Sequence, residues 1–321
     1  MRSLPGFSST GLNRTLGSLN AARACNACAR PISPPSSVTN ELLDMFCALN
    51  GTTSTPWRAR KRHNPATRTL LPASEVVPQI NIAPRMDANA AIITHMVTVV
   101  LMHSPFLGPS SMRPLADELA SDGVAVLLVD LQMTVNEAPV HQRLIGAFAD
   151  ALEDSGVGGP LVLVGHSGAG PLLPCFADAL ELDVAGLVFL DSDLPTPGRS
   201  WRETVDPALV RQVKASVRDG RLPRWDRWFD EDPLRLVPAE LREEMRDEAP
   251  EVPWEFLKEQ RPVVEWSGAC GYVLLSAVYD DQADKAEALG WPVERVESHH
   301  LAAATSPSAV AAALKTVISR L

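Results

Sequence analysis

The sequence LVLVGHSGAG, residues 161–170, decides the fold class of this chain. Its first four residues form an apolar run after a glycine-containing loop, which is typical of a short strand buried on both faces. A glycine-rich turn with Ser167 at its centre follows at once and opens a helix-like segment. A strand-to-helix turn this tight needs small neighbours and holds its central residue in a strained conformation with an exposed side chain. The stretch therefore predicts a serine presented at the carboxyl edge of a parallel sheet, where open α/β folds bind their ligands.

The residues beside Ser167 fit a nucleophilic role for its hydroxyl. The amide of Gly168, at the start of the following helix, is placed to stabilise a developing oxyanion. Ala169 stands where the pattern G-x-S-x-G has its last glycine, and alanine is small enough to keep the turn. The pattern is a weak signal by itself and a strong one directly after a buried strand.

A serine hydroxyl becomes a good nucleophile only when a base takes its proton. The adjacent pair His299-His300 stands after the last predicted strand and before the final helix. Two adjacent histidines in one loop cannot both point inward, so we expect one of them to serve Ser167. His103 and His166 flank backbone features that need bulk, and we interpret both as packing residues beside the site.

A carboxylate must orient that imidazole, and the sequence offers candidates in two loops. Asp280 and Asp281 follow one predicted strand near the C-terminus, and Asp191 and Asp193 follow the predicted strand before it. We favour the first loop, because acids often end the other strand for capping reasons alone, and keep the second loop as the alternative. Tyr279, beside Asp280, could face the pocket, but we favour a packing role for it.

From residue 96 onward, apolar runs typical of buried strands alternate with helix-like stripes. Such alternation gives a mostly parallel sheet with flanking helices on both faces. We therefore predict an α/β fold with a sheet of about six strands. The predicted strands are residues 97–102, 124–129, 161–164, 184–190, 272–277 and 292–296.

Residues 195–266 break this alternation. They contain 13 basic and 16 acidic residues, seven aromatic side chains and no convincing strand. Amphipathic helices fit around residues 209–217 and 236–245. Because the segment interrupts the predicted sheet, we interpret it as an inserted helical cap at about residues 195–266, with an ordinary surface subdomain as the alternative. We interpret its tryptophans first as the hydrophobic underside of the cap and second as the wall of an apolar pocket.

The first 85 residues differ in composition from the remainder. Residues 1–85 hold 10 basic and 3 acidic residues, whereas residues 86–321 hold 19 and 36. Because the first segment lacks sustained periodicity, we interpret residues 1–85 as a disordered N-terminal extension and residues 86–321 as the folded domain. We favour a start assigned too early, with Met86 or Met96 as the true start; a genuine tail and an organelle-targeting segment are the alternatives.

Composition excludes several function classes. A net charge of −10 argues against general nucleic-acid binding, and no apolar run reaches the roughly 18 residues that a membrane helix needs. Five cysteines in 321 residues do not make a disulfide framework, so we expect a reducing cytoplasm. We expect a small-molecule substrate, no metal or organic cofactor, and no nucleic-acid or membrane partner, and we leave the oligomeric state open.

From about residue 97 to the C-terminus the chain resembles the α/β-hydrolase superfamily, in particular its compact bacterial members of unassigned substrate. His103-Ser104-Pro105 resembles the His-Gly oxyanion loop of that superfamily, and the Ser167 turn resembles its nucleophile elbow. The resemblance implies an α/β-hydrolase fold and a catalytic triad in the chain order Ser, Asp, His.

The resemblance also selects among the candidate side chains. The strand-Gly-x-x-Asp pattern of the superfamily maps onto the residues that end at Asp280 and favours it over Asp281. The usual separation between the histidine and the proline of the last helix favours His300, seven residues before Pro307, over His299. The triad that the resemblance implies is Ser167, Asp280 and His300.

Two departures from the superfamily pattern are evident. The superfamily normally has two more strands before the first strand found here, and residues 1–85 do not supply them. One oxyanion donor is usually the amide after His-Gly, and that position is Pro105, which has no N–H. We therefore assign the oxyanion hole to the amides of Gly168 and Phe106.

These observations predict a serine hydrolase that cleaves a small ester, thioester or lactone with an apolar portion through an acyl-enzyme. Because Pro105 removes one expected oxyanion donor, a lyase or a carbon–carbon bond hydrolase of the same fold is the alternative. A non-catalytic ligand-binding protein of this fold is a third interpretation, although such proteins usually lack a triad member.

Overall fold

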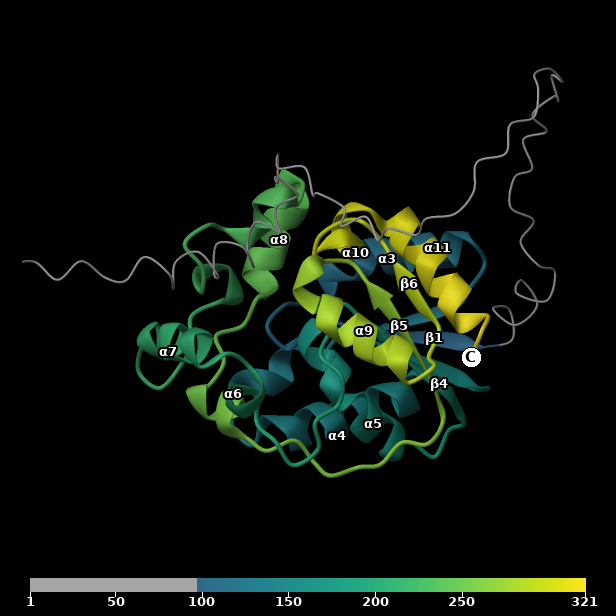
Figure 1. Cartoon of the computed structure of the whole chain (residues 1–321), viewed down its shortest axis with the longest axis horizontal. Coiled ribbons are helices and arrows are strands. Elements are labelled where there is room, and N and C mark those ends of the chain that lie inside the picture. The colour runs from purple at the N-terminus through teal and green to yellow at the C-terminus, as the bar shows by residue number, and fades with distance from the viewer. Residues whose placement is uncertain (1–96) are drawn as a thin grey trace, which may run out of the picture. The chain divides into compact units, whose positions relative to one another are not determined.

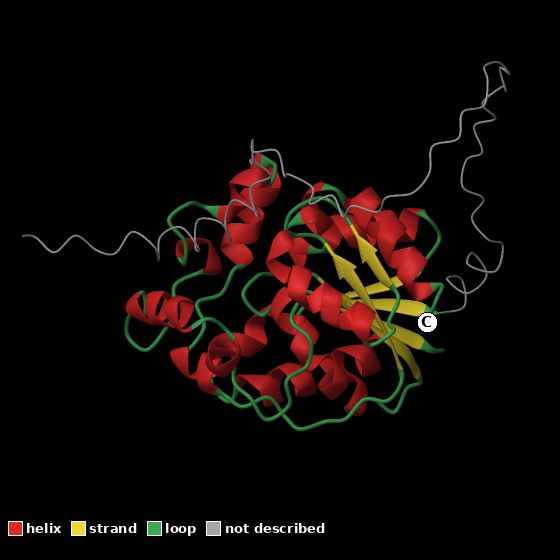
Figure 2. Cartoon of the chain, in the orientation of Figure 1, coloured by secondary structure: helices red, strands yellow, loops and turns green. Residues whose placement is uncertain are grey.

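The computed structural model describes residues 97–321 (Figure 1). The predictions for residues 1–85 and for the domain boundary at residue 86 therefore lie outside the described residues. In the described part, helices lie on both sides of a parallel sheet (Figure 2), as the sequence predicts.

The described residues form a sheet of six parallel strands in the order β2-β1-β3-β4-β5-β6. The strands are β1 (Thr98–Met102), β2 (Ala125–Val129), β3 (Leu161–His166), β4 (Val184–Leu190), β5 (Ala269–Leu274) and β6 (Val293–Arg295). The chain runs from β1 outward to β2 and then returns to the other side of β1 as β3. Open α/β sheets bind ligands at the carboxyl ends of the strands where the order reverses in this way. Ser167 follows β3 directly and so lies at this switch point.

Side chains alternate between two cores along the inner strands. Val99 and Leu101 belong to the core under α3, α10 and α11, whereas Val100 and Met102 belong to the core under α4, α5 and α9. All four are fully buried, which is why the sequence shows an unbroken apolar run there. The flanking helices are α3 (Arg113–Ser121), α4 (Val140–Ser155), α5 (Leu173–Asp178), α9 (Asp280–Ala288), α10 (Ala302–Thr305) and α11 (Pro307–Ile318).

Strands β2 and β5 differ from their predictions. The prediction that β2 is buried on both faces is wrong: Ala125 is exposed and residues 126–128 are half-buried, because no other described strand pairs with the outer side of β2. β5 lies three residues earlier than predicted. It ends at Leu274 because the next two amides donate to the side chain of Asp191 instead of continuing the strand ladder.

A helical segment joins β4 to β5, and we call residues 195–266 the inserted segment. It contains α6 (Trp201–Thr204), α7 (Pro207–Ala215) and α8 (Ala239–Glu248), with 3-10 turns η4 (Trp225–Arg227), η5 (Pro233–Leu236) and η6 (Trp254–Lys258). In Figure 1 its three α-helices stand together beside the sheet. α7 begins earlier than predicted because Asp206 accepts a hydrogen bond from the amide of Ala208 and caps the first turn. α8 begins later because η5 forms a separate turn before it.

No helix of the described residues combines the length and the apolar composition that spanning a membrane requires.

Candidate active site

Ser167 stands in a strained turn at the end of β3. Its φ angle is 55°, in the left-handed region that residues with a Cβ rarely adopt. The turn depends on its small neighbours, since a Cβ on Gly165 would lie 3.0 Å from the Cα of Gly170. A Cβ on Gly170 would lie 2.1 Å from Ser192 Oγ. Ala169 is buried without such a conflict, in agreement with the prediction that alanine keeps the turn.

His300 and Asp191 form a buried pair close to this turn. His300 Nδ1 lies 2.7 Å from Asp191 Oδ2. The other oxygen of Asp191, Oδ1, accepts hydrogen bonds from the amides of Leu275 at 2.8 Å and Ser276 at 2.9 Å. Ser276 Oγ donates to Oδ2 at 2.7 Å. Asp191 is fully buried, so these four bonds hold its carboxylate in one orientation toward the imidazole.

The prediction that Asp280 contacts His300 is wrong. Asp280 is the first residue of α9, its side chain is 56% exposed, and its carboxylate lies 3.6 Å from Arg295 Nη1. The reason is the early end of β5: a 3-10 turn, η7 (Ala277–Tyr279), follows and carries Asp280 away from the imidazole. Asp281, the neighbouring candidate, is exposed on the wall of the cavity described below. The alternative, Asp191, is the acid that the structure places against His300.

Of the two adjacent histidines, His300 lines the cavity and His299 is held elsewhere. The Nδ1 atom of His299 accepts from the amide of Leu301 at 3.3 Å, and its Nε2 lies 3.1 Å from Thr305 Oγ1. Burial lowers the pKa of His299, and the neighbouring His300 lowers it further. Both ring nitrogens of His299 therefore have partners within its own loop.

His166 and His103 are buried beside the site and bond to the backbone. His166 Nε2 donates to the carbonyl of His300 at 3.0 Å, and the two rings are in tilted contact, with centroids 4.6 Å apart and an angle of 30° between their planes. Burial, followed by the effect of His300, lowers the pKa of His166 to about 3, so this ring stays neutral. His103 Nε2 accepts from the amide of Leu131 at 3.1 Å, which leaves the proton on Nδ1, 2.9 Å from the carbonyl of Ser104.

The two amides assigned to the oxyanion hole lie close to the serine turn. A Cβ on Gly168 would lie 3.1 Å from Pro105 Cδ and 3.3 Å from Phe106 Cε2, so only glycine lets this loop approach. The amide of Phe106 donates to Ser104 Oγ at 3.4 Å. A bond of this length is weak, so the N–H remains free to change its acceptor.

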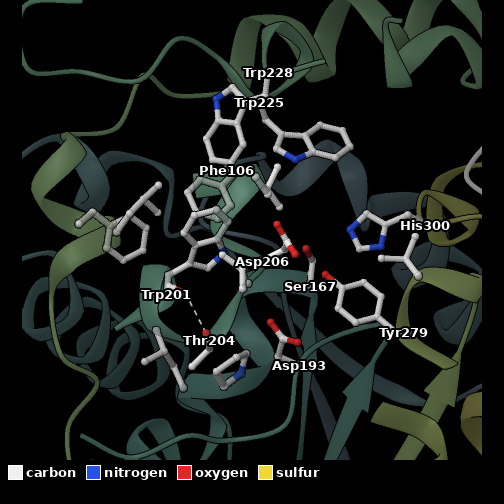
Figure 3. A pocket seen from close by; sticks show the side chains of 18 of the residues that line it. Phe106, Ser167, Asp193, Trp201, Thr204, Asp206, Trp225, Trp228, Tyr279 and His300 are labelled. Atoms are coloured by element: carbon white, nitrogen blue, oxygen red, sulfur yellow. Dashed lines mark hydrogen bonds between the residues drawn. The ribbon is translucent and has the colours of Figure 1, made fainter. Parts of the chain in front are cut away.

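Tyr279 is a site residue that the sequence interpretation assigned to packing. Its hydroxyl points toward Ser167, and its ring stacks on His300 with centroids 5.6 Å apart (Figure 3). Burial raises its pKa, so the phenol stays protonated. The available signal was its place at the end of the loop after β5, at the same sheet edge as Ser167.

A cavity of about 490 Å³ lies over Ser167 and His300 (Figure 3). The inserted segment contributes much of its wall, and Trp225 lies with its ring centroid 6.1 Å from that of His300. The aromatic lining residues are Phe106, Trp201, Trp225, Trp228, Phe229, Phe256 and Tyr279. The charged or titratable ones, besides His300, are His141, Asp193, Asp206, Arg261 and Asp281. In the described residues no cluster of three or more His, Cys, Asp or Glu side chains is arranged to hold a metal ion.

Comparison with known proteins gives one family match. A family model described as "Alpha/beta hydrolase family" matches residues 99–313. No curated protein has a matching sequence.

Several solved structures share the fold. One is an extracellular alpha/beta-hydrolase from a Paenibacillus species, which is described as sharing structural and functional homology with tobacco salicylic acid binding protein 2. It is 16% identical to this chain with a TM-score of 0.55, and the match covers 69% of this chain and 98% of that one. Tomato methylketone synthase I, solved with 2-tridecanone, is 16% identical with a TM-score of 0.52 and coverages of 70% and 98%. Polyneuridine aldehyde esterase is 15% identical with a TM-score of 0.51 and coverages of 69% and 99%. At these identities the likeness concerns the fold alone.

Proposed function

Because the chain belongs to the alpha/beta hydrolase family, we propose that it is a serine hydrolase whose triad is Ser167, His300 and Asp191. One observation carries the proposal: a serine with φ 55° and an imidazole held 2.7 Å from a buried carboxylate line the same cavity. A strained serine, a base and an orienting acid are the three parts that nucleophilic acyl transfer requires.

The proposed reaction starts with proton transfer from Ser167 to His300. Asp191 accepts a hydrogen bond from the Nδ1–H of His300, which holds the tautomer whose Nε2 is unprotonated and able to take the proton of Ser167 Oγ. The oxygen attacks the substrate carbonyl carbon, and the C=O electron pair moves to the oxygen to form an oxyanion. His300 then gives the proton to the leaving group as its bond to carbon breaks. Water, activated by the same imidazole, releases the acyl group from Ser167.

The oxyanion is stabilised in this proposal by the amides of Gly168 and Phe106. Pro105 has no N–H, so the second donor must come one residue later in the loop. An oxyanion is a stronger acceptor than a hydroxyl, so it replaces Ser104 Oγ as the partner of the Phe106 amide.

A small ester, thioester or lactone with an apolar portion fits the cavity best. Seven aromatic side chains line it, and they bury apolar surface at little conformational cost. Its volume of about 490 Å³ is in the range of small-molecule sites.

The test is covalent labelling of the full chain with a fluorophosphonate, followed by peptide mapping. We expect a single adduct on Ser167 that is absent in Ser167→Ala and forms orders of magnitude more slowly in His300→Ala. His299→Ala is the matched control and should label at nearly the wild-type rate, because its ring bonds within its own loop. A folded wild-type protein that takes no label would contradict the proposal and favour a ligand-binding protein of the same fold.

A lyase or carbon–carbon bond hydrolase is the second candidate, favoured by the existing bond between the Phe106 amide and Ser104 Oγ. If the amide keeps that bond during turnover, the oxyanion has one amide donor fewer and an acyl-enzyme forms poorly. Acid quenching during turnover of a p-nitrophenyl ester distinguishes the two, because only the serine hydrolase accumulates an acyl adduct visible by intact mass spectrometry.

We retain the reducing cytoplasm as the proposed location. Cys175 and Cys270 are buried free thiols, and burial raises the pKa of each to about 11, which makes them unreactive.

A further inference from the structure

Of the four charged side chains outside the proposed triad that line the cavity, Asp206 and Asp281 are exposed and two are not. Asp193 follows β4 by three residues and is half-buried, and Arg261 follows η6 and is only 7% exposed. Charged side chains are rarely buried to this extent unless they have partners. We therefore expect each of these two side chains to have a binding partner.

The carboxylate of Asp193 has unused hydrogen-bonding capacity. Among residues 97–321 no group donates a hydrogen bond to it or forms an ion pair with it. Burial raises its pKa, while the positive charges of Arg261 and Lys285 act in the opposite direction. A carboxylate has about four acceptor sites, so this group is available to a ligand in the cavity.

The guanidinium of Arg261 is short of acceptors. Its Nη1 donates to Thr196 Oγ1 at 2.6 Å. Within the described part of the chain its other N–H groups have no acceptor. Burial lowers its pKa, and Asp193 opposes that effect. Four of the five N–H donors of this arginine thus remain open to a ligand.

No hydrogen bond or ion pair joins Asp193 to Arg261, although each acts electrostatically on the other. Burying two opposite charges separately is unfavourable unless each finds a partner. We propose that an uncharged amide group of the substrate bridges them, accepting from Arg261 through its carbonyl oxygen and donating its N–H to Asp193. The inference rests on the proposed function, because this amide belongs to the same molecule whose ester carbonyl Ser167 attacks.

An amide suits this pair better than an ion does. An anion binds Arg261 but is repelled by Asp193. A cation binds Asp193 but is repelled by Arg261. Two hydrogen bonds of ~2.9 Å with an amide between them span more than an ion-pair distance, which suits two side chains that form no ion pair with each other. His141, which lines the cavity as well, adds no charge at neutral pH because burial lowers its pKa.

The aromatic side chains give the substrate its direction. In Figure 3 Trp225 and Trp228 lie on one side of Ser167 and Asp193 lies on the other. The scissile carbonyl then lies between an apolar group against the tryptophans and an amide against Asp193 and Arg261. The substrate class is an ester or thioester with an apolar leaving group and an amide-bearing acyl chain.

The test compares p-nitrophenyl esters that differ only at the end of the acyl chain. The 5-carbamoylpentanoate ester carries the amide, and the 6-methylheptanoate ester is its hydrocarbon isostere. The 5-carboxypentanoate and 6-ammoniohexanoate esters carry a negative and a positive charge. We expect kcat/KM for the amide ester to exceed that of the isostere by about tenfold, although an apolar cavity by itself favours the hydrocarbon.

Variants of Asp193 assign this preference to the bridge. Asp193→Ala should abolish the tenfold ratio, and Asp193→Asn should retain part of it, because the asparagine carbonyl still accepts from the amide N–H. Arg261→Lys should lower the ratio as well, since a lysine lacks the fork of donors. Asp281→Asn removes the same charge from an exposed position on the cavity wall and should leave the ratio unchanged.

A binding measurement separates this inference from the proposed function. Binding of the same esters to Ser167→Ala, followed by quenching of tryptophan fluorescence, reports the preference without turnover. If p-nitrophenyl acetate is not hydrolysed but the amide ester still binds preferentially, the proposed function fails and the amide site stands. If the acetate is hydrolysed but the amide ratio is one, or a charged ester is preferred, the bridging inference is overturned and the hydrolase stands.

Discussion

The carboxyl edge of the sheet and the inserted segment meet at one cavity, but they hold their polar groups differently. At the sheet edge Asp191 is fully buried, and each of its two carboxylate oxygens takes part in two hydrogen bonds. Several charged groups of the inserted segment pair at the surface instead, as Glu244 of α8 does with Arg113 of α3, whose side chains are 43% and 41% exposed. Removing one partner of a buried bonded group leaves the other unsatisfied, whereas water replaces a lost partner at the surface.

The sheet edge and the inserted segment therefore have different roles in the proposed reaction. The sheet edge holds the groups that are proposed to react, in a geometry that tolerates little change. The inserted segment supplies much of the cavity wall, and it contacts the rest of the protein through buried apolar side chains as well as exposed ion pairs. Substitutions in the segment are therefore expected to alter which substrates bind, and substitutions at the sheet edge to alter whether the reaction occurs.

The largest effect on activity is expected at Asp191, the proposed acid of the triad. Asp191→Ala should lower kcat/KM for p-nitrophenyl acetate by about 10⁴, the loss expected when the orienting acid of a triad is removed. Asp280→Ala is the matched control, and it should stay within about twofold because surface substitutions away from a site change little. A large loss in Asp280→Ala together with a small loss in Asp191→Ala would place the triad acid outside the buried pair.

The second largest effect is expected at Gly170, whose backbone passes close to Ser192 behind the serine turn. Gly170→Ala places a Cβ 2.1 Å from Ser192 Oγ, so we expect about 3 kcal/mol of destabilisation in urea unfolding, as for an overpacked core. Gly146→Ala in α4 meets no atom within 4 Å and should stabilise the helix by about 0.5–1 kcal/mol. Equal stability of the two variants would show that the turn relaxes without cost.

The buried side chain of His166 should make the stability of the folded protein depend on pH. The pKa of His166 falls from an ordinary 6.5 to about 3 in the folded protein, so the unfolded chain binds a proton there first as the pH falls. The free energy of unfolding should therefore decrease by about 2 kcal/mol between pH 7 and pH 5 on account of this one group. His166→Asn should remove that part of the pH dependence in urea titrations. An unchanged slope would mean that His166 binds its proton equally well in the folded and the unfolded chain.

The smallest effect is expected at the surface pair between α3 and α8. A double-mutant cycle of Arg113→Ala and Glu244→Ala should give a coupling free energy of about 0.5 kcal/mol, and less in high salt. A coupling several times larger would mean that the inserted segment is fastened as rigidly as the sheet edge.

The sequence predicts what depends on near neighbours in the chain and misses what depends on strand register. Ser167 could be found because the apolar strand, the glycines and the turn are contiguous. His300 could be found from its position before the last helix. The acid could not be assigned, because the choice between Asp191 and Asp280 depends on where β5 ends, and it ends where a side chain takes over its hydrogen bonds. Local patterns do not contain that information.

The inserted segment shows the same limit. Its helical character follows from composition and periodicity. The sequence does not show, however, that Asp193, which follows a strand, and Arg261, in a loop 68 residues later, line the same cavity. Nothing in either local sequence marks them as neighbours. The burial of β2 was wrongly predicted for a related reason, because an edge strand differs from an inner strand only in what lies beside it.

Asp191 also continues the sheet beyond the end of β4. Its amide donates to the carbonyl of Val273 at 2.8 Å, and its side chain then takes the place of a strand carbonyl for Leu275 and Ser276. An asparagine at this position would keep the oxygen that accepts these two amides, and so would keep the fold. Its amide nitrogen, however, would donate to His300 Nδ1 and move the imidazole proton to Nε2, where it blocks proton transfer from Ser167. A single change of this kind would give lineages of this fold an evolutionary route from an enzyme to a stable, inactive ligand-binding protein.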